Sequence, residues 1–415
     1  MTTLRKRAAY GADAVGQTAS GLPGPFPRTI GPRAMEYLQE VVDSGLTSDM
    51  VTRFENAFAQ AHGVRHCIAT PGCTPALAAL AAALDLEPGD EVVVSPITDY
   101  GSVQGLISQH LIPVFADTEP GTVNMSAATI EPCLSDRTRA ILTVHKTGIP
   151  CDMDPINALA AAHDLVVYED ACQAVFGRYR GRLAGTLARA GAFSFDAEKT
   201  MGSDVGGCII TDDDALAERL RLVGQSRGAL MEEGFGRKHV ELGYAHRMTQ
   251  STAAISLAQL EIAREQVEQR DRMARLLTER MGRIPGVTPL PLPDYMDVYS
   301  CWMFGISVDP QAINCSVDEL AAQLAAAGIN GAGTGRYYLM PAALTFLQER
   351  AQAQAYPYSC PPASRRIQYG AEACPQARGF LETFIRWSTF CEKYREEHCE
   401  LAADIVRQVM ARNGR

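Results

Sequence analysis

The stretch LVVYEDA, residues 165–171, has four apolar or aromatic side chains followed directly by Glu169 and Asp170. A run that is apolar throughout, rather than at every second position, is typical of a parallel strand with both sheet faces covered. Asp170 then falls at the carboxyl end of that strand, where open α/β sheets bind their ligands. The stretch therefore predicts a parallel sheet with a carboxylate at its ligand-binding edge. A buried aspartate that caps the next helix would give the same pattern.

Similar apolar runs lie on both sides of this stretch. They cover residues 64–70, 91–96, 112–117, 139–145, 190–196 and 207–212. Helical patterns lie between several of them, at residues 74–84, 99–110, 155–163 and 214–223. The alternation of strands and helices predicts an α/β fold with a mostly parallel seven-stranded sheet between helices.

A second, smaller unit follows the α/β part. Residues 249–282 lack internal Gly and Pro and predict a long helix, after which a Pro- and Gly-rich stretch marks a boundary. Beyond it we expect a strand at 301–308 and a helix that begins at the capping-box pair Ser316 and Glu319. The predicted parts are an N-terminal arm (1–30), a large α/β domain (31–285) and a small C-terminal α+β domain (286–415).

Composition disfavours several classes of function. The chain has 415 residues and a net charge of −10 without an extended basic run, which disfavours binding to nucleic acid or to an anionic membrane. No apolar run approaches the ~20 residues of a membrane span, and the basic N-terminus lacks the apolar core of a secretory signal. The twelve scattered cysteines include no C-x-x-C pair, so we expect reduced thiols, no metal site and a cytoplasmic protein.

The stretch ATPGCTPALAALAAAL, residues 69–84, predicts a strand end, a glycine turn and a helix opened by Thr74 and Pro75. The backbone N–H groups of Gly72, Cys73 and Thr74 form a site for an anion such as a phosphate at the start of this helix. Neither the P-loop pattern nor G-x-G-x-x-G is present, so the nucleotide-binding motifs do not fit. The alternative interpretation is a well-capped helix without a ligand.

A lysine in the stretch GAFSFDAEKTMGSDVGG, residues 191–207, completes the pattern. Lysine occurs only five times in the chain, so arginine is the usual cation. The question is therefore why position 199 is a lysine and not an arginine. A desolvated lysine amine can attack a carbonyl, whereas a guanidinium stays protonated. Ser194, just before it, could add a hydroxyl to a phosphate site. The alternative is a surface lysine without a chemical role.

The phosphate site, the carboxylate and the amine together predict one cofactor. Pyridoxal 5′-phosphate (PLP) needs an anion site for its phosphate, an acid for its ring nitrogen and an amine for its aldehyde. Asp170 would keep the ring nitrogen protonated, and Lys199 would hold the aldehyde and move the substrate proton.

Seven ordered motifs extend this prediction along the chain. They are LEPGDEVVVSP, PVFADTEPGTVNM, VHKTGIPCDMDPI, VVYEDACQAVFGRYRGRLAGT, GAFSFDAEKT, GGCIITDDDALAERLRLV and LGYAHRMT. From about residue 30 to the C-terminus the sequence resembles the DegT/StrS family of sugar aminotransferases, which have the aspartate-aminotransferase fold (fold type I, PLP-dependent).

The resemblance implies a role for each site residue. Lys199 is implied as the lysine that binds the cofactor aldehyde, and Asp170 as the partner of the ring nitrogen. Gln173 is implied beside the ring hydroxyl, while Ser194 and the turn at residues 72–74 are implied as the phosphate site. Relatives that remove a hydroxyl from a keto-sugar carry His in place of the lysine, so Lys199 favours transamination.

The resemblance also implies a homodimer with shared active sites. In this family the partner subunit contributes to the phosphate site from the segment that reads LGYAHRM here. Ala245 stands where many relatives have Asn, which leaves His246 or Arg247 for that contact. Tyr100 lies one place later than the aromatic residue that stacks on the cofactor ring in relatives.

The predicted reaction is a two-stage transamination from glutamate or glutamine to a keto-sugar or cyclitol ketone, in the biosynthesis of an antibiotic or a cell-surface glycan. The candidate substrate residues are Arg336, Tyr337, Tyr338 and the pair His145–Lys146, with packing as the alternative role of the tyrosines. Lys146 is also a candidate for a second catalytic lysine. Three other functions stay open. They are another PLP reaction (a dehydratase or an aromatising synthase), a non-catalytic PLP-binding regulator, and an oxidoreductase, which would need a glycine-rich dinucleotide turn that is absent.

Overall fold

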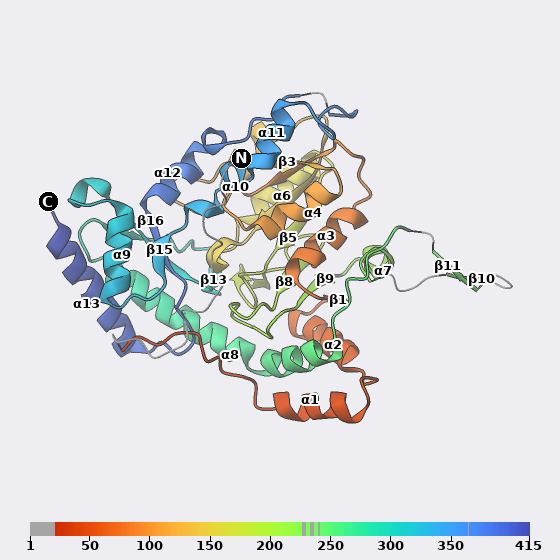
Figure 1. The fold of residues 1–415 in the computed structure, drawn as a ribbon, viewed down its shortest axis with the longest axis horizontal. Coiled ribbons are helices and arrows are strands. Elements are labelled where there is room, and N and C mark those ends of the chain that lie inside the picture. The colour runs from red at the N-terminus through yellow and green to blue at the C-terminus, as the bar shows by residue number, and fades with distance from the viewer. Residues whose placement is uncertain (1–20, 226–229, 233–235, 240, 364) are drawn as a thin grey trace, which may run out of the picture.

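The computed structural model describes residues 21–225, 230–232, 236–239, 241–363 and 365–415, so most of the predicted N-terminal arm lies outside the described residues. A seven-stranded sheet organises the structure (Figure 1). In spatial order its strands are β1 (His66–Thr70), β9 (Gly207–Thr211), β8 (Gly191–Ser194), β5 (Val166–Asp170), β4 (Thr138–Val144), β2 (Glu91–Val94) and β3 (Ile112–Phe115).

The direction of the strands confirms the mostly parallel sheet. The five strands from β8 to β3 are parallel to one another. β9 is antiparallel to both of its neighbours, so β1 points the same way as β8. The carboxyl ends of β1, β2, β4, β5 and β8 therefore meet at one edge, and the first residue of β9, Gly207, lies at that edge too.

Helices cover both faces of the sheet, which explains the uniformly apolar strands. Ile68 and Ile209 belong to one buried cluster, which includes Leu77, while Cys67 and Ile210 belong to another. The helices of this part are α1 (Ala34–Asp43), α2 (Met50–His62), α3 (Cys73–Ala83), α4 (Tyr100–Ser108), α5 (Ala127–Ile130), α6 (Met153–Ala162), α7 (Asp214–Val223) and α8 (Gln250–Met281). α2 and α8 pack on one face near β1, and α3 packs against β8 and β9 on the other.

The C-terminal part is built on a four-stranded antiparallel sheet. Its strands, in order, are β12 (Val287–Pro289), β14 (Phe304–Val308), β16 (Phe384–Trp387) and β15 (Ala332–Thr334). The helices α9 (Val317–Ala327), α12 (Pro375–Thr383) and α13 (Glu396–Asn413) pack around it. α8 is one long helix, as expected, and it contacts α2 at one end of the molecule and α13 at the other.

Short elements complete the described chain. They are β6 (Arg178–Tyr179), β7 (Arg182–Leu183), β13 (Met296–Val298), β10 (Leu230–Glu232), β11 (Gly236–Lys238), α10 (Met340–Ala343) and α11 (Thr345–Gln352). Turns of 3₁₀ helix lie at η1 (Glu131–Cys133), η2 (Lys146–Gly148), η3 (Pro310–Ala312), η4 (Arg336–Tyr338) and η5 (Ala371–Ala373). The predicted strand at 301–308 is shorter than expected, because it begins at Phe304, whereas the predicted capping box of Ser316 and Glu319 is present.

The C-terminal part also returns to the large sheet. Leu339 forms a β-bridge with Ile97, and the Arg365 guanidinium pairs with Glu91 at 2.6 Å. The Tyr369 hydroxyl donates to the Pro113 carbonyl at 2.8 Å. The proposed division into 31–285 and 286–415 stays a prediction. The bridge to Ile97 brings the C-terminal part to the carboxyl end of β2, whereas Arg365 and Tyr369 contact the amino-terminal ends of β2 and β3. None of the helices in the described part of the chain has the length and hydropathy needed to cross a membrane.

Candidate active site

Asp170 is the last residue of β5 and is buried at the carboxyl edge of the sheet. The Ser102 hydroxyl of α4 donates to Oδ2 at 2.6 Å, and the backbone N–H of Cys172 donates to Oδ1 at 3.1 Å. Ser102 is in turn 2.6 Å from the Thr98 hydroxyl. The Asp170 carboxylate is therefore held in place by α4 and by the residues that follow β5. The sequence prediction missed Ser102.

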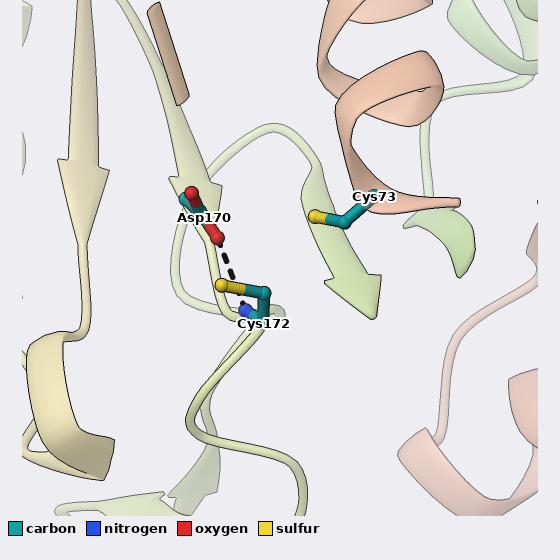
Figure 2. A group of neighbouring side chains, drawn as sticks. All are labelled: Cys73, Asp170 and Cys172. Carbon is teal, nitrogen blue, oxygen red and sulfur yellow. Dashed lines mark hydrogen bonds between the residues drawn. The ribbon is translucent and has the colours of Figure 1, made fainter. Parts of the chain in front are cut away.

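Two thiols lie beside this carboxylate. Figure 2 shows Cys73, at the start of α3, pointing toward Asp170 and Cys172. The ligand atoms of the three residues all lie within 4.8 Å of one another. The hydrogen bond to Cys172, burial and the charge of Asp170 raise the pKa of the Cys73 thiol well above its ordinary value. A thiol that stays protonated is a poor metal ligand, because the thiolate is the form that binds metals.

Lys199 lies in a closed turn that follows β8. Its backbone N–H donates to the Asp196 carbonyl at 2.9 Å, and that of Ala197 donates to Asp204 at 2.8 Å. The side chain is half-buried, and Nζ lies 4.0 Å from the ring centre of Trp302. Burial acts to lower the pKa of Lys199, but the neighbouring Cys172 and Asp170 groups outweigh it and raise that pKa overall.

Trp302 is a second residue that the sequence prediction missed. Its indole N–H donates to the Glu198 carbonyl at 3.0 Å, and its backbone N–H donates to the Thr147 carbonyl at 3.1 Å. The Thr147 N–H donates to the side-chain oxygen of buried Gln173 at 2.7 Å. Trp302 thus connects the Lys199 turn to the residues that follow β4, and Thr147 connects these to Gln173 after β5. The Gln173 side-chain oxygen is used in this contact, so its amide nitrogen is the group that could bind a ligand.

The predicted phosphate site is built where β1, β9 and α3 meet. Gly72 is the N-cap of α3, and the first N–H groups of the helix, those of Cys73 and Thr74, have no carbonyl within the helix to bond. A Cβ atom on Gly207 would lie 2.4 Å from the Gly72 carbonyl carbon and 2.6 Å from the Cys73 nitrogen. Ser194 pairs with Gly207 in the sheet, so its hydroxyl belongs to the same corner. The turn and the serine are thus brought together as the sequence predicted.

Three further candidates lie around this corner. Tyr100, the first residue of α4, is 45% exposed. The His246 ring stacks on Tyr244, with ring centres 4.8 Å apart, and hydrogen-bonds to the backbone of Pro75 in the first turn of α3 of its own chain. Arg247 is exposed. The contribution of the corresponding segment of a partner subunit stays a prediction.

The candidates of the C-terminal part divide into two groups. Tyr338 is buried, its carbonyl accepts from the Thr98 N–H at 3.1 Å, and its ring lies over the Lys146 amine. Arg336 instead forms an exposed ion pair with Asp318 at 2.8 Å, and nothing in the structure brings it to Lys199. The side chain of Tyr337 lies outside the described residues.

His145, a predicted substrate residue, is turned into the core in this structure. Its side chain is fully buried, and Nε2 lies 2.8 Å from a Glu169 carboxylate oxygen. The Cys151 N–H donates to the other ring nitrogen at 3.2 Å. Glu169 also accepts N–H bonds from the segment 185–188, so the pair holds the core together under the sheet edge.

The comparison with known proteins identifies the family. The sequence model of the DegT/DnrJ/EryC1/StrS aminotransferase family matches residues 28–369. This chain belongs to that family. It is 35% identical over 297 residues to GDP-perosamine synthase of Caulobacter vibrioides, which covers 71% of this chain and 79% of that protein.

Solved structures share the fold of this chain. The structure of 3-amino-5-hydroxybenzoic acid synthase has a TM-score of 0.80 at 23% identity, over 94% of this chain and all of that one. Spr1654 from Streptococcus pneumoniae in its PLP-form has a TM-score of 0.79 at 19% identity, over 94% and 97% of the two chains. The predicted fold class is confirmed, and the protein is an aminotransferase of the DegT/DnrJ/EryC1/StrS family.

Proposed function

We propose that the protein uses PLP to move an amino group from glutamate or glutamine to a ketone of a sugar or cyclitol. The observation that carries the proposal is the meeting of three groups at one sheet edge. These are the Lys199 amine, the Asp170 carboxylate and the N-terminus of α3. The name of the relative GDP-perosamine synthase favours a sugar acceptor.

The residues at this edge fit the cofactor. Asp170 would meet the ring nitrogen, and the N–H groups at residues 72–74, with Ser194, would hold the phosphate. Gly207 leaves the space in which the turn comes close to the sheet, since any Cβ there would overlap the turn. Lys199 would hold the aldehyde, with Gln173 beside the ring hydroxyl. Bound PLP would supply an electron sink and carry the amino group between the two substrates.

The side chains of this chain would position the reaction and move its proton. Lys199 Nζ would take the proton from the substrate carbon and return it, since a lysine amine can act as acid and as base. The Trp302 ring, fixed by two hydrogen bonds, would hold Nζ at the sheet edge. Ser102 and the Cys172 N–H would keep the Asp170 oxygens in place while the ring nitrogen is bound.

The proposal includes a homodimer with shared active sites in the cytoplasm. Exposed apolar side chains support an interface with a second subunit, because apolar patches on a surface commonly mark interfaces. Met35 and Val42 on α1 are 73% and 68% exposed, and Leu46 just after it is 70% exposed. Val205, in the turn that follows Lys199, is a further exposed apolar side chain, at 51%.

A single-turnover assay tests this function. Protein loaded with PLP is mixed with glutamate, and a transaminase releases one 2-oxoglutarate per site while the cofactor keeps the amino group. The same protein is then offered keto-sugars and cyclitol ketones, and the aminated product is identified. Loaded protein that releases no oxo acid from glutamate or glutamine would refute the proposal, and would leave a dehydratase, a synthase or a binding-only regulator.

A further inference from the structure

Lys146 is a second amine at the same edge, and the reaction described above does not use it. It is the first residue of η2, two residues after Val144, which pairs with Asp170 in the sheet. Its side chain is only 2% exposed. Within the described part of the chain, Nζ has no hydrogen-bond partner. A buried amine without a partner loses the hydration that an exposed lysine keeps, so a ligand that pairs with it would be favoured.

An aromatic ring and several titratable groups lie around Nζ. It lies 3.4 Å from the ring centre of Tyr338, and the Arg386 guanidinium lies 5.9 Å from the centre of the same ring. The titratable groups that lie close enough to act on it include Lys199, Cys172, Asp99 and Asp170. Burial, followed by the charge of Lys199, lowers the pKa of Lys146 to about 7.

The backbone ties this amine to the residues around Lys199. The Lys146 N–H donates to the Asn124 side-chain oxygen at 3.3 Å. The next residue, Thr147, accepts a bond from Trp302 and donates one to Gln173. The Lys199 amine packs against the ring of the same Trp302. Trp302 therefore connects the segments that carry the two amines, and both lie at one site.

We propose that Lys146 binds a carboxylate of the amino-acid donor, and of the oxo acid that replaces it, while the reacting carbon lies at Lys199. The proposal rests on the proposed transaminase function. It follows from a buried amine that lies over the Tyr338 ring at the edge of the sheet that carries Asp170, and that has no hydrogen-bond partner in the described chain. A carboxylate would supply the charge-assisted hydrogen bonds that Nζ lacks.

The test uses PLP-loaded protein and glutarate, a dicarboxylate that has neither an amine nor a ketone and cannot react. Glutarate binding is measured by calorimetry for the wild type and for Lys146→Met, which keeps an unbranched side chain and removes the charge. The variant should bind glutarate at least about 10-fold more weakly, as expected when a hydrogen bond to a charged group is lost. Glutaramide, the uncharged analogue, should bind both proteins equally.

The comparison of glutarate with glutaramide gives a readout that a structural role would not move, because a distorted site would weaken the binding of both ligands. The matched control is Lys393→Met, because the Lys393 amine already donates to the Pro27 carbonyl, and this variant should bind glutarate as the wild type does.

Two results would overturn the inference. Equal glutarate affinity in wild type and Lys146→Met, or an equal loss of glutarate and glutaramide affinity in Lys146→Met, would show that Nζ does not pair with the carboxylate. The single-turnover assay separates this failure from failure of the proposed function. If the loaded wild type releases 2-oxoglutarate from glutamate, the function stands and only the role of Lys146 falls.

Discussion

Replacing Gly207 with alanine tests the predicted phosphate site with one added methyl group. A Cβ atom there would lie 2.4 Å from the Gly72 carbonyl carbon and 2.6 Å from the Cys73 nitrogen, whereas ordinary contacts are 3.4–4 Å. The neighbours are backbone atoms, so no side-chain rotation relieves the overlap. The turn that carries the phosphate-binding N–H groups must therefore move away from the sheet by about 1 Å, judged by the usual contact distance.

That movement sets the expected loss of affinity. An N–H···O bond of about 2.9 Å stretched by about 1 Å no longer counts as a hydrogen bond. Loss of two bonds to a charged phosphate, at about 1.5–3 kcal/mol each, costs about 3–6 kcal/mol. The Kd for PLP should therefore rise at least about 100-fold, at about 1.4 kcal/mol per tenfold change.

The assay is a titration of cofactor-free protein with PLP, followed by absorbance or fluorescence. Pyridoxal, which lacks the phosphate, serves as the matched ligand and should bind Gly207→Ala and wild type about equally. Gly379→Ala is the matched variant, because a Cβ on this α12 residue would meet no atom within 4 Å. A folded Gly207→Ala protein that binds PLP within threefold of wild type would refute the position of the phosphate site.

Three other predictions follow from the same structure. Lys199→Arg should lose the borohydride-reducible bond to PLP and at least about 100-fold in turnover, because a guanidinium cannot bind the aldehyde or move the proton. Ser102→Ala should raise the Kd for PLP by about 10- to 100-fold, since it removes a hydrogen bond to the Asp170 carboxylate. Burial lowers the pKa of His62 to about 4, so the folded state binds fewer protons than the unfolded state between pH 4 and 6.5. Stability should therefore fall by about 3 kcal/mol as the pH drops from 6.5 to 4, and His62→Phe should remove this part of the loss in urea unfolding.

Each of these predictions has a contradicting result. Normal turnover by Lys199→Arg would remove Lys199 from the reaction. An unchanged Kd in Ser102→Ala would mean that Asp170 does not need this support to bind the ring nitrogen. If the wild type and His62→Phe lose the same stability between pH 6.5 and 4, the buried imidazole, stacked on Phe58 with ring centres 4.1 Å apart, is not the cause.

The sequence predicts those site residues whose positions follow from strand direction. Asp170 and Ser194 end parallel strands, and the Gly72 turn follows another, so an all-apolar strand pattern is enough to bring them to one edge. The hydrophobic runs also predict the covered sheet, because residues such as Cys67 and Ile68 pack into clusters on opposite faces.

The contributors that sequence reasoning missed come from tertiary contacts. Trp302 reaches Lys199 across about a hundred residues of sequence, and its hydrogen bond to Glu198 depends on how the C-terminal part folds back. His145 and Lys146 are neighbours in sequence, yet the first turns into the core to meet Glu169 and the second lies under Tyr338. Only the structure separates the two, because both follow the same apolar strand and carry polar side chains.

The central claim is that the Lys199 amine, and not the neighbouring Lys146 amine, holds the cofactor. The most direct measurement is borohydride reduction of PLP-loaded protein, followed by proteolysis and mass spectrometry to find the modified lysine. The label should be found on the peptide that contains Lys199, and it should disappear in Lys199→Arg. A label on Lys146, or protein that takes up no label at all, would contradict the claim.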